Sequence, residues 1–238
     1  MALLQYKNGD GSRKFACGGS LITESWVLTA AHCIKPGLIS VRLGEYEISK
    51  NIKKDCSHGK AIKTCTQHMD FKISTIVTHP DNNQTTGVKN IALIKLKTRA
   101  RRNKNIKPIC LPFKSELLHA PYEEDTLTVA GWGLTEKGFT SKILKKHLIS
   151  QRPSAACKLA HSEVNVSISK LCLGSSNKQA SNGCADSGGP IITLIKDTPD
   201  FYTQIGIVQM GGEESSNFYA ENVFDSMDWI TRVIGESK

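Results

Sequence analysis

Short runs of apolar and β-branched residues recur along this chain and are separated by turn residues, a pattern that predicts strands. The predicted strands cover residues 17–22, 26–29, 38–43, 71–78, 91–96, 126–132, 190–195 and 202–208. A helical repeat of apolar residues is found mainly near the end, from Val223 to Ile234, with a cap predicted at Asp225. Many short strands are typical of an all-β barrel or sandwich.

The polar stretch 114–125 contains Pro121 and shows no alternation, so it is the natural connection between two halves. A chain of 238 residues can bury a full core. We expect one domain over residues 1–238, with an N-terminal half at 1–115 and a C-terminal half, which includes the helix, at 116–238. Two halves of this kind imply a cleft between them, where sites are common.

Eight cysteines and two glycosylation sequons, at Asn83 and Asn165, indicate an oxidising, secretory compartment, and we expect an extracellular protein. Four side chains could also be drawn as a zinc site, namely Cys56, His58, Cys65 and His68. Their spacing is unusual for zinc ligands, so a disulfide is the favoured interpretation.

The net charge is +9, and the densest basic stretch covers residues 95–107, without interleaved aromatic residues. It predicts a solvated loop rather than a nucleic-acid surface. No apolar run is long enough to span a membrane. The loop 45–65 carries too many lysines to attract a hard cation, so we expect no metal and no other cofactor. The histidines other than His32 lie in polar surroundings and are expected to be exposed.

Two motifs carry the parts that acyl transfer needs, which are a nucleophile, a base and backbone N–H donors for an oxyanion. Thr29-Ala-Ala-His32-Cys ends an apolar strand with a histidine. Asp186-Ser187-Gly-Gly-Pro places a serine on a glycine-rich turn. Each motif alone is weak, because Ser-Gly-Gly-Pro is often only a turn.

Together with four further motifs, at 17–22, 91–96, 109–112 and 130–133, these residues occur in the order found in the chymotrypsin-type serine endopeptidases. The chain resembles that family from end to end. The resemblance implies an all-β fold of two antiparallel six-stranded β-barrels packed face to face, with a C-terminal helix. It also implies that Ser187 attacks a peptide carbonyl and that His32 carries the proton.

Other cysteines resemble those of the arthropod clip-domain subgroup, whose members act in blood cascades of immunity and development. The family resemblance implies bridges between Cys17 and Cys33 and between Cys157 and Cys172, and the subgroup resemblance implies one between Cys56 and Cys65. It also implies that Cys110 ties the domain to an upstream clip segment. The expected partners are a protein or peptide substrate, or a protease of the same cascade.

The chain departs from the family at the third member of the triad, where Asn90 replaces the aspartate. An amide neither accepts the imidazole N–H well nor stabilises imidazolium. In an intact triad this substitution lowers turnover by about 10⁴. We therefore expect a strongly impaired site of His32, Asn90 and Ser187.

Further departures surround the serine. Residues 1–4 resemble the strand that follows the family's activation segment, so we expect that segment to be missing and Asp186 to lack its amine partner. Ala185 stands where the family has glycine; its N–H and that of Ser187 are the expected oxyanion donors. Cys184 is displaced by one position, which predicts the loss of the bridge beside the pocket.

The specificity pocket is predicted from Ser181, Gly211 and Asn217, with Asn182 replacing Ser181 if one residue is deleted. Neither floor residue is acidic, so trypsin-like cleavage after arginine or lysine is disfavoured. Asn217 or Phe218 is also expected to fill the pocket.

Two functions follow from these patterns. The first is a secreted serine endopeptidase of an arthropod proteolytic cascade, impaired at Asn90. The alternative is a non-catalytic homologue that binds a protease or substrate as a cofactor. The number of defects in one mechanism favours the second slightly, because the surviving members of such a group do not compensate for the lost ones.

Overall fold

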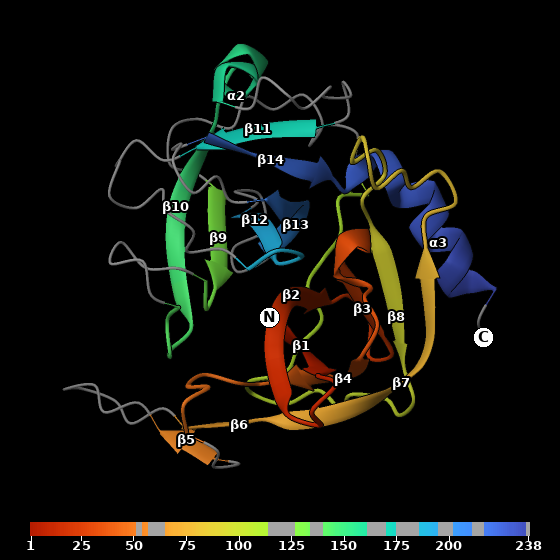
Figure 1. The fold of residues 1–238 in the computed structure, drawn as a ribbon, viewed down its shortest axis with the longest axis vertical. Helices are drawn as coiled ribbons and strands as arrows, with labels where there is room; N and C mark the ends of the chain where they lie inside the picture. The colour runs from red at the N-terminus through yellow and green to blue at the C-terminus, as the bar shows by residue number, and fades with distance from the viewer. Residues whose placement is uncertain are drawn as a thin grey trace.

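Two closed antiparallel barrels of six strands each form most of the molecule (Figure 1). The computed structural model describes residues 1–50, 54–56, 65–113, 127–133, 140–160, 170–174, 186–194, 202–210 and 217–236. The predicted all-β fold with two barrels is confirmed. Among these residues, no helix combines the length and apolar character that a membrane crossing requires.

The first barrel has the strand order β1-β2-β3-β8-β7-β4. Its strands are β1 (Ala2–Lys7), β2 (Arg13–Leu21), β3 (Trp26–Thr29), β4 (Leu38–Leu43), β7 (Met69–Thr78) and β8 (Ala92–Leu96). Leu4, Leu28, Leu43 and Leu93 are completely or almost completely buried inside it. A separate pair, β5 (Lys54–Cys56) and β6 (Cys65–Gln67), places Cys56 opposite Cys65 in register.

The second barrel has the order β10-β11-β14-β13-β12-β9. Its strands are β9 (Leu127–Gly131), β10 (Lys145–Gln151), β11 (Lys170–Gly174), β12 (Pro190–Leu194), β13 (Tyr202–Met210) and β14 (Asn217–Asn222). Leu127, Leu173 and Ile191 are fully buried in its core. A short helix, α2 (Ser154–Ala160), lies against β11 and β14.

The C-terminal helix α3 (Met227–Gly235) follows the second barrel in sequence but packs on the first. Trp229 and Ile230 join the first barrel's apolar cluster, and the Trp229 ring lies 4.9 Å from that of His79. The prediction of an exposed His79 is therefore wrong, because α3 covers it. The predicted cap is also wrong: Asp225 lies inside a 3₁₀ turn, and Ser226 precedes the helix without a side-chain cap.

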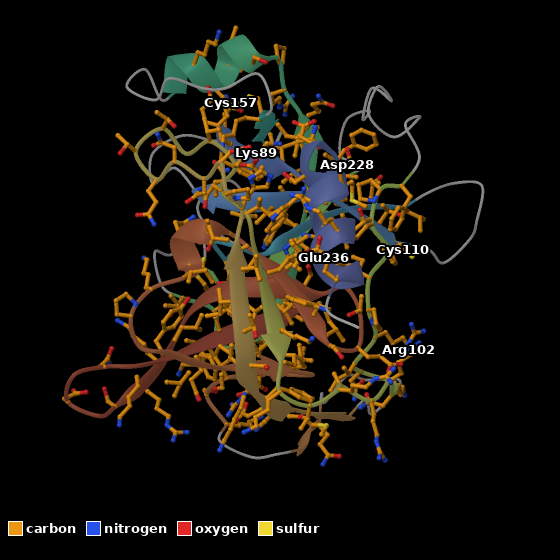
Figure 2. The ribbon with its side chains drawn as sticks, turned by 90° about the vertical axis from the view of Figure 1, so that its right-hand side faces the viewer. Lys89, Arg102, Cys110, Cys157, Asp228 and Glu236 are labelled. Carbon is orange, nitrogen blue, oxygen red and sulfur yellow. A yellow bond between two sulfur atoms is a disulfide. The ribbon has the colours of Figure 1, made fainter. Side chains whose placement is uncertain are left out.

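Lys89 ties the loop before β8 to the start of this helix (Figure 2). Its Nζ donates to the backbone carbonyl of Asp225 at 2.6 Å. Lys89 also has a φ of 46°, the only positive value among the described residues that are not glycine. Such a conformation is strained for lysine and persists only where surrounding contacts hold it. The residue that follows it, Asn90, is thus placed by long-range contacts.

Candidate active site

His32 lies in a 3₁₀ turn, Ala31–Cys33, directly after β3. The turn is fixed from two sides. Cys33 is bonded to Cys17 of β2, and its carbonyl accepts a 2.7 Å hydrogen bond from the hydroxyl of Tyr6. The imidazole is therefore carried by a rigid part of the first barrel.

Ser187 lies on the turn that leads into β12 of the second barrel. Its carbonyl accepts a 2.8 Å hydrogen bond from the backbone of Gly18, in the first barrel. Gly188 has a φ of 81°, and a β-carbon there would lie 2.7 Å from the carbonyl oxygen of Gly18 and in contact with the Thr29 hydroxyl. Glycine is required because the serine turn presses directly against the strand that precedes His32.

Asn90 reaches His32 from the loop before β8 and is 9 % exposed. Its Oδ1 accepts a 2.9 Å hydrogen bond from the backbone N–H of His32. Its Nδ2 lies 2.9 Å from the ring Nδ1, whereas Oδ1 lies 3.3 Å from that atom. The structure thus brings the predicted triad acid position into contact with the predicted base.

The backbone N–H of His32 decides which way the Asn90 amide is turned. It is a donor only, so it needs Oδ1 as its acceptor, and flipping the amide would set two donors against each other. Nδ2 then donates to Nδ1, and the proton of the neutral ring must be on Nε2. A ring protonated at Nε2 cannot accept the proton of a serine hydroxyl.

The surroundings also keep His32 neutral. Burial lowers its pKa below the usual value, and the charges of Lys35 and Lys170 act in the same direction. In the described part of the chain, no carboxylate bonds to the ring. Within the described ranges, His32 therefore lacks the anionic support of a triad.

The hydroxyl of Ser187 points toward the backbone carbonyl of Gln209, at 3.5 Å. Among the described residues, no hydrogen bond joins it to His32. Nucleophile and base come from opposite barrels but are not engaged with each other.

Asp186 is buried beside the serine, and its Oδ2 accepts a 2.8 Å hydrogen bond from the backbone of Trp132. Burial raises its pKa to about 6, and the bond from Trp132 opposes this only in part. No salt bridge to Asp186 is found within the ranges that the structure describes. Its approach also explains Gly131, where a β-carbon would lie 2.9 Å from Oδ2.

Several predicted site residues lie outside the described residues: Ala185, Ser181, Asn182, Gly211 and Cys184. Asn217 begins β14, and its amide donates to the carbonyl of Ala156 at 3.4 Å. Phe218 packs in the core of the second barrel, so the expectation that it fills the pocket is wrong. It alternates with Asn217 and points to the opposite face of the strand.

Two of the predicted bridges are present, Cys17–Cys33 and Cys157–Cys172. The side chains of Cys56 and Cys65, and the sequon at Asn165, lie outside the described part of the structure. Asn83 is exposed. The expectation of an exposed His68 is wrong, because its ring is buried with Nδ1 3.2 Å from Glu45.

Three buried side chains next to the site could not be predicted from the sequence, those of Lys170, Gln209 and Glu221. Glu221 is fully buried in β14 and accepts a hydrogen bond from the backbone of Asn90. The only signal in the sequence is alternation along β14, which sets Glu221 on the same face as Asn217 and opposite the core residue Phe218.

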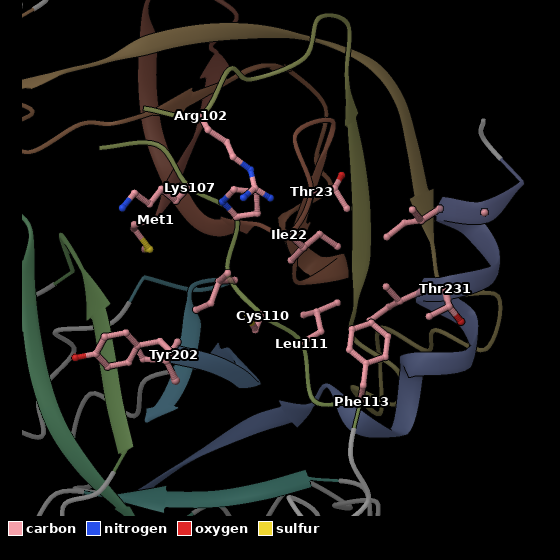
Figure 3. Close-up of a pocket in the computed structure, with 16 residues that line it drawn as sticks. Met1, Ile22, Thr23, Arg102, Lys107, Cys110, Leu111, Phe113, Tyr202 and Thr231 are labelled. Carbon is pink, nitrogen blue, oxygen red and sulfur yellow. The ribbon is translucent and has the colours of Figure 1, made fainter. Parts of the chain in front are cut away.

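A groove of about 1030 Å³ lies elsewhere, around Cys110 (Figure 3). None of the candidate active-site residues that the structure describes lines it. Phe113 and Tyr202 are exposed beside it, and Cys110 is exposed and forms no disulfide with a described cysteine. Arg102 and Lys107 add positive charge to its lining.

Comparison with known proteins gives consistent results. The family model named Trypsin matches residues 1–230. Serine protease grass of Drosophila melanogaster is 35% identical over 97% of this chain, and phenoloxidase-activating factor 3 of Holotrichia diomphalia is 36% identical over 97%. CLIP domain-containing serine protease B15 of Anopheles gambiae is 32% identical over 98%.

The chain spans 63%, 67% and 65% of the lengths of these three relatives, respectively. The crystal structure of the Drosophila Grass clip serine protease superposes with a TM-score of 0.86 at 33% identity, covering 100% of this chain and 69% of that one. The resemblance to clip-domain serine proteases is thus confirmed. The chain belongs to the trypsin family.

Proposed function

We propose that this chain is a serine-protease homologue that acts in an arthropod extracellular cascade by binding a protein partner rather than by cleaving it. One observation carries the proposal. The Nδ2 of Asn90 lies 2.9 Å from Nδ1 of His32, while its Oδ1 is held by the backbone of His32. This arrangement puts the ring proton on Nε2, where it prevents His32 from acting as the base for Ser187.

Two further observations support a site without strong turnover. The Ser187 hydroxyl is directed to the carbonyl of Gln209. Asp186 is buried with a raised pKa, which is typical of a carboxyl that lacks a compensating cation. An extracellular cascade is supported by two disulfides and by relatives named as clip-domain proteases and phenoloxidase-activating factors.

Weak endopeptidase activity is the second candidate. It is favoured by the retention of His32 and Ser187 on facing parts of the two barrels, with the ring still hydrogen-bonded to the residue at the triad acid position. An oxyanion hole and substrate binding alone preserve about 10³ to 10⁴ of rate over water when a triad is broken. Such a rate would be detectable only with a concentrated enzyme.

The expected partner surface includes the groove at Cys110. An exposed cysteine beside Phe113 and Tyr202 suits a covalent link to a cysteine-bearing segment such as a clip module. The protein that binds at the candidate active site is a protein substrate or a protease of the same cascade.

Rescue by a variant that lacks the Ser187 hydroxyl tests the function. Arthropod plasma is depleted of the protein, and either the wild-type protein or Ser187→Ala is added back before the amidase activity generated by the cascade is measured. We expect both proteins to restore it equally. Restoration by the wild type alone would establish the endopeptidase instead, and restoration by neither would reject the cascade role.

A further inference from the structure

Glu221 collects three hydrogen bonds on a single buried carboxylate oxygen. Its Oε2 accepts from the backbone N–H of Asn90 at 3.1 Å, from Nζ of Lys170 at 2.9 Å and from Nε2 of Gln209 at 2.5 Å. Glu221 is 0 % exposed, and the side chain of Lys170 is 3 % exposed. A buried charge is retained only where its partners compensate for lost hydration. The three donors therefore hold this oxygen in one position next to the site.

Two of these donors belong to residues that contact the triad positions. Asn90 contacts His32 through its side chain, and the backbone carbonyl of Gln209 accepts a hydrogen bond from the Ser187 hydroxyl. Glu221 is therefore connected to the base through Asn90 alone and to the nucleophile through Gln209 alone. No other carboxylate in the described chain is hydrogen-bonded to Asn90 or Gln209.

The backbone at Asn90 needs such an anchor. Lys89 precedes it with a φ of 46°, and the N–H of Ile91 turns back to the carbonyl of Lys89 at 2.8 Å. Lys170, the ion-pair partner of Glu221, also donates to the carbonyl of Gly87 in the same loop. The strained turn is thus held on one side by the hydrogen bond from Lys89 to the start of α3. On the other side it is held by the Glu221 cluster, which consists of Glu221 and its partners Asn90, Lys170 and Gln209.

The charge of Glu221 does not replace the missing aspartate. Lys170 lies 2.9 Å from it and neutralises it locally, and the charge of Lys170 contributes to lowering the pKa of His32. The influence of Glu221 on the ring is therefore exerted through hydrogen bonds and the position of Asn90.

We propose that Glu221 is a positioning residue: it fixes the backbone of Asn90 so that the amide Nδ2 donates to Nδ1 of His32 and the ring holds its proton on Nε2. The inference rests on the proposed function only in taking Asn90 as the partner of His32. The inference is tested by detecting the hydrogen bond itself. It can therefore fail while Ser187→Ala still restores the cascade, and it can hold while that rescue fails.

The test is nitrogen-15 NMR of the His32 ring, assigned by comparison with His32→Gln. An Asn90 Nδ2–H to His32 Nδ1 hydrogen bond gives a scalar coupling between the two nitrogens and the shifts of a single Nε2–H tautomer. Two variants are matched by removing the buried cation in both, Lys170→Met/Glu221→Gln and Lys170→Met/Glu221→Met. The first keeps an acceptor for the N–H of Asn90, and the second keeps none.

We expect the coupling in the wild-type protein and in the Glu221→Gln double variant, and its loss in the Glu221→Met double variant. Persistence in the latter, or absence from the wild type, would overturn the proposal. Loss in both double variants would also overturn it, because the charge and not the hydrogen bond would then be needed. If the Glu221→Met protein does not fold, Glu221→Asp, which withdraws the carboxylate while keeping its charge, must lose the coupling; retention there contradicts the proposal.

Discussion

At the scale of single residues, the amide nitrogen of Asn90 stands where an aspartate would have a carboxylate oxygen, and this exchange determines the protonation of His32. Asn90 occupies nearly the same volume as an aspartate and keeps the contact to the backbone of His32. The atom facing Nδ1 becomes a donor instead of an acceptor. Geometry is preserved, but the proton moves to the wrong ring nitrogen.

Asn90→Asp should reverse this arrangement. The pKa of His32 should rise by about 1 to 3 because an opposite charge then lies within bonding distance of the ring. NMR titration measures the change, and Asn83→Asp, which adds the same charge at an exposed position, should leave the His32 pKa nearly unmoved.

Peptide hydrolysis by Asn90→Asp should nevertheless remain far below the gain of about 10⁴ expected from restoring an otherwise intact triad. The Ser187 hydroxyl and Asp186 would still lack their active arrangement. Recovery of a normal protease rate in this variant would show that Asn90 is the only defect.

Asp186→Asn should stabilise the protein at neutral pH. The folded state holds the Asp186 proton up to about pH 6, whereas the unfolded state releases it near 3.8, so stability is lost as pH rises through this window. The wild type should therefore be less stable than Asp186→Asn by up to about 3 kcal/mol at pH 7.5 and about equal to it below pH 4. Urea unfolding at both pH values measures the difference, and a pH-independent difference would contradict the assignment.

At the scale of elements, runs of apolar and β-branched residues predicted eight of the strands, whereas strands without a clear run of this kind were missed. β8 and β12 were predicted almost to the residue. β10 was missed because its sequence, KKHLISQ, has only two strongly apolar residues and an exposed face. Its pairing with β9 over five residue pairs, rather than its composition, makes it a strand.

The serine turn is the element most sensitive to substitution. Gly188→Ala should cost more than about 2 kcal/mol, because alanine is strained at a φ of 81° and its β-carbon meets the first barrel. Gly9→Ala is the matched control, since nothing lies within 4 Å of a β-carbon there. Equal free energies of unfolding for the two variants would mean that the turn does not press on the first barrel as described.

At the scale of the whole molecule, motif order predicted the two barrels, but the contacts between them could not be read from the sequence. The Glu221 cluster joins residues 90, 170, 209 and 221, which only the register of three strands and a loop brings together. The same holds for Ser20 and Gln204, which meet between the barrels 184 residues apart.

Ser20→Ala tests that contact between the barrels. The hydroxyl donates to Oε1 of Gln204, which is fully buried, so its removal leaves an acceptor without a donor. We expect a loss of about 1 to 3 kcal/mol in the free energy of unfolding, measured with urea. Ser12→Ala, in an exposed turn, should change it by less than about 0.5 kcal/mol. An equally small effect for Ser20→Ala would show that this contact does not stabilise the protein.

Covalent labelling of Ser187 by a fluorophosphonate tests most directly whether His32 can activate the serine. It is measured beside peptide hydrolysis in the wild-type protein, His32→Ala and Ser187→Ala. If Asn90 prevents His32 from acting as a base, the wild type should label and hydrolyse no faster than His32→Ala. Labelling at Ser187 that depends on His32 and is accompanied by peptide turnover would contradict the account.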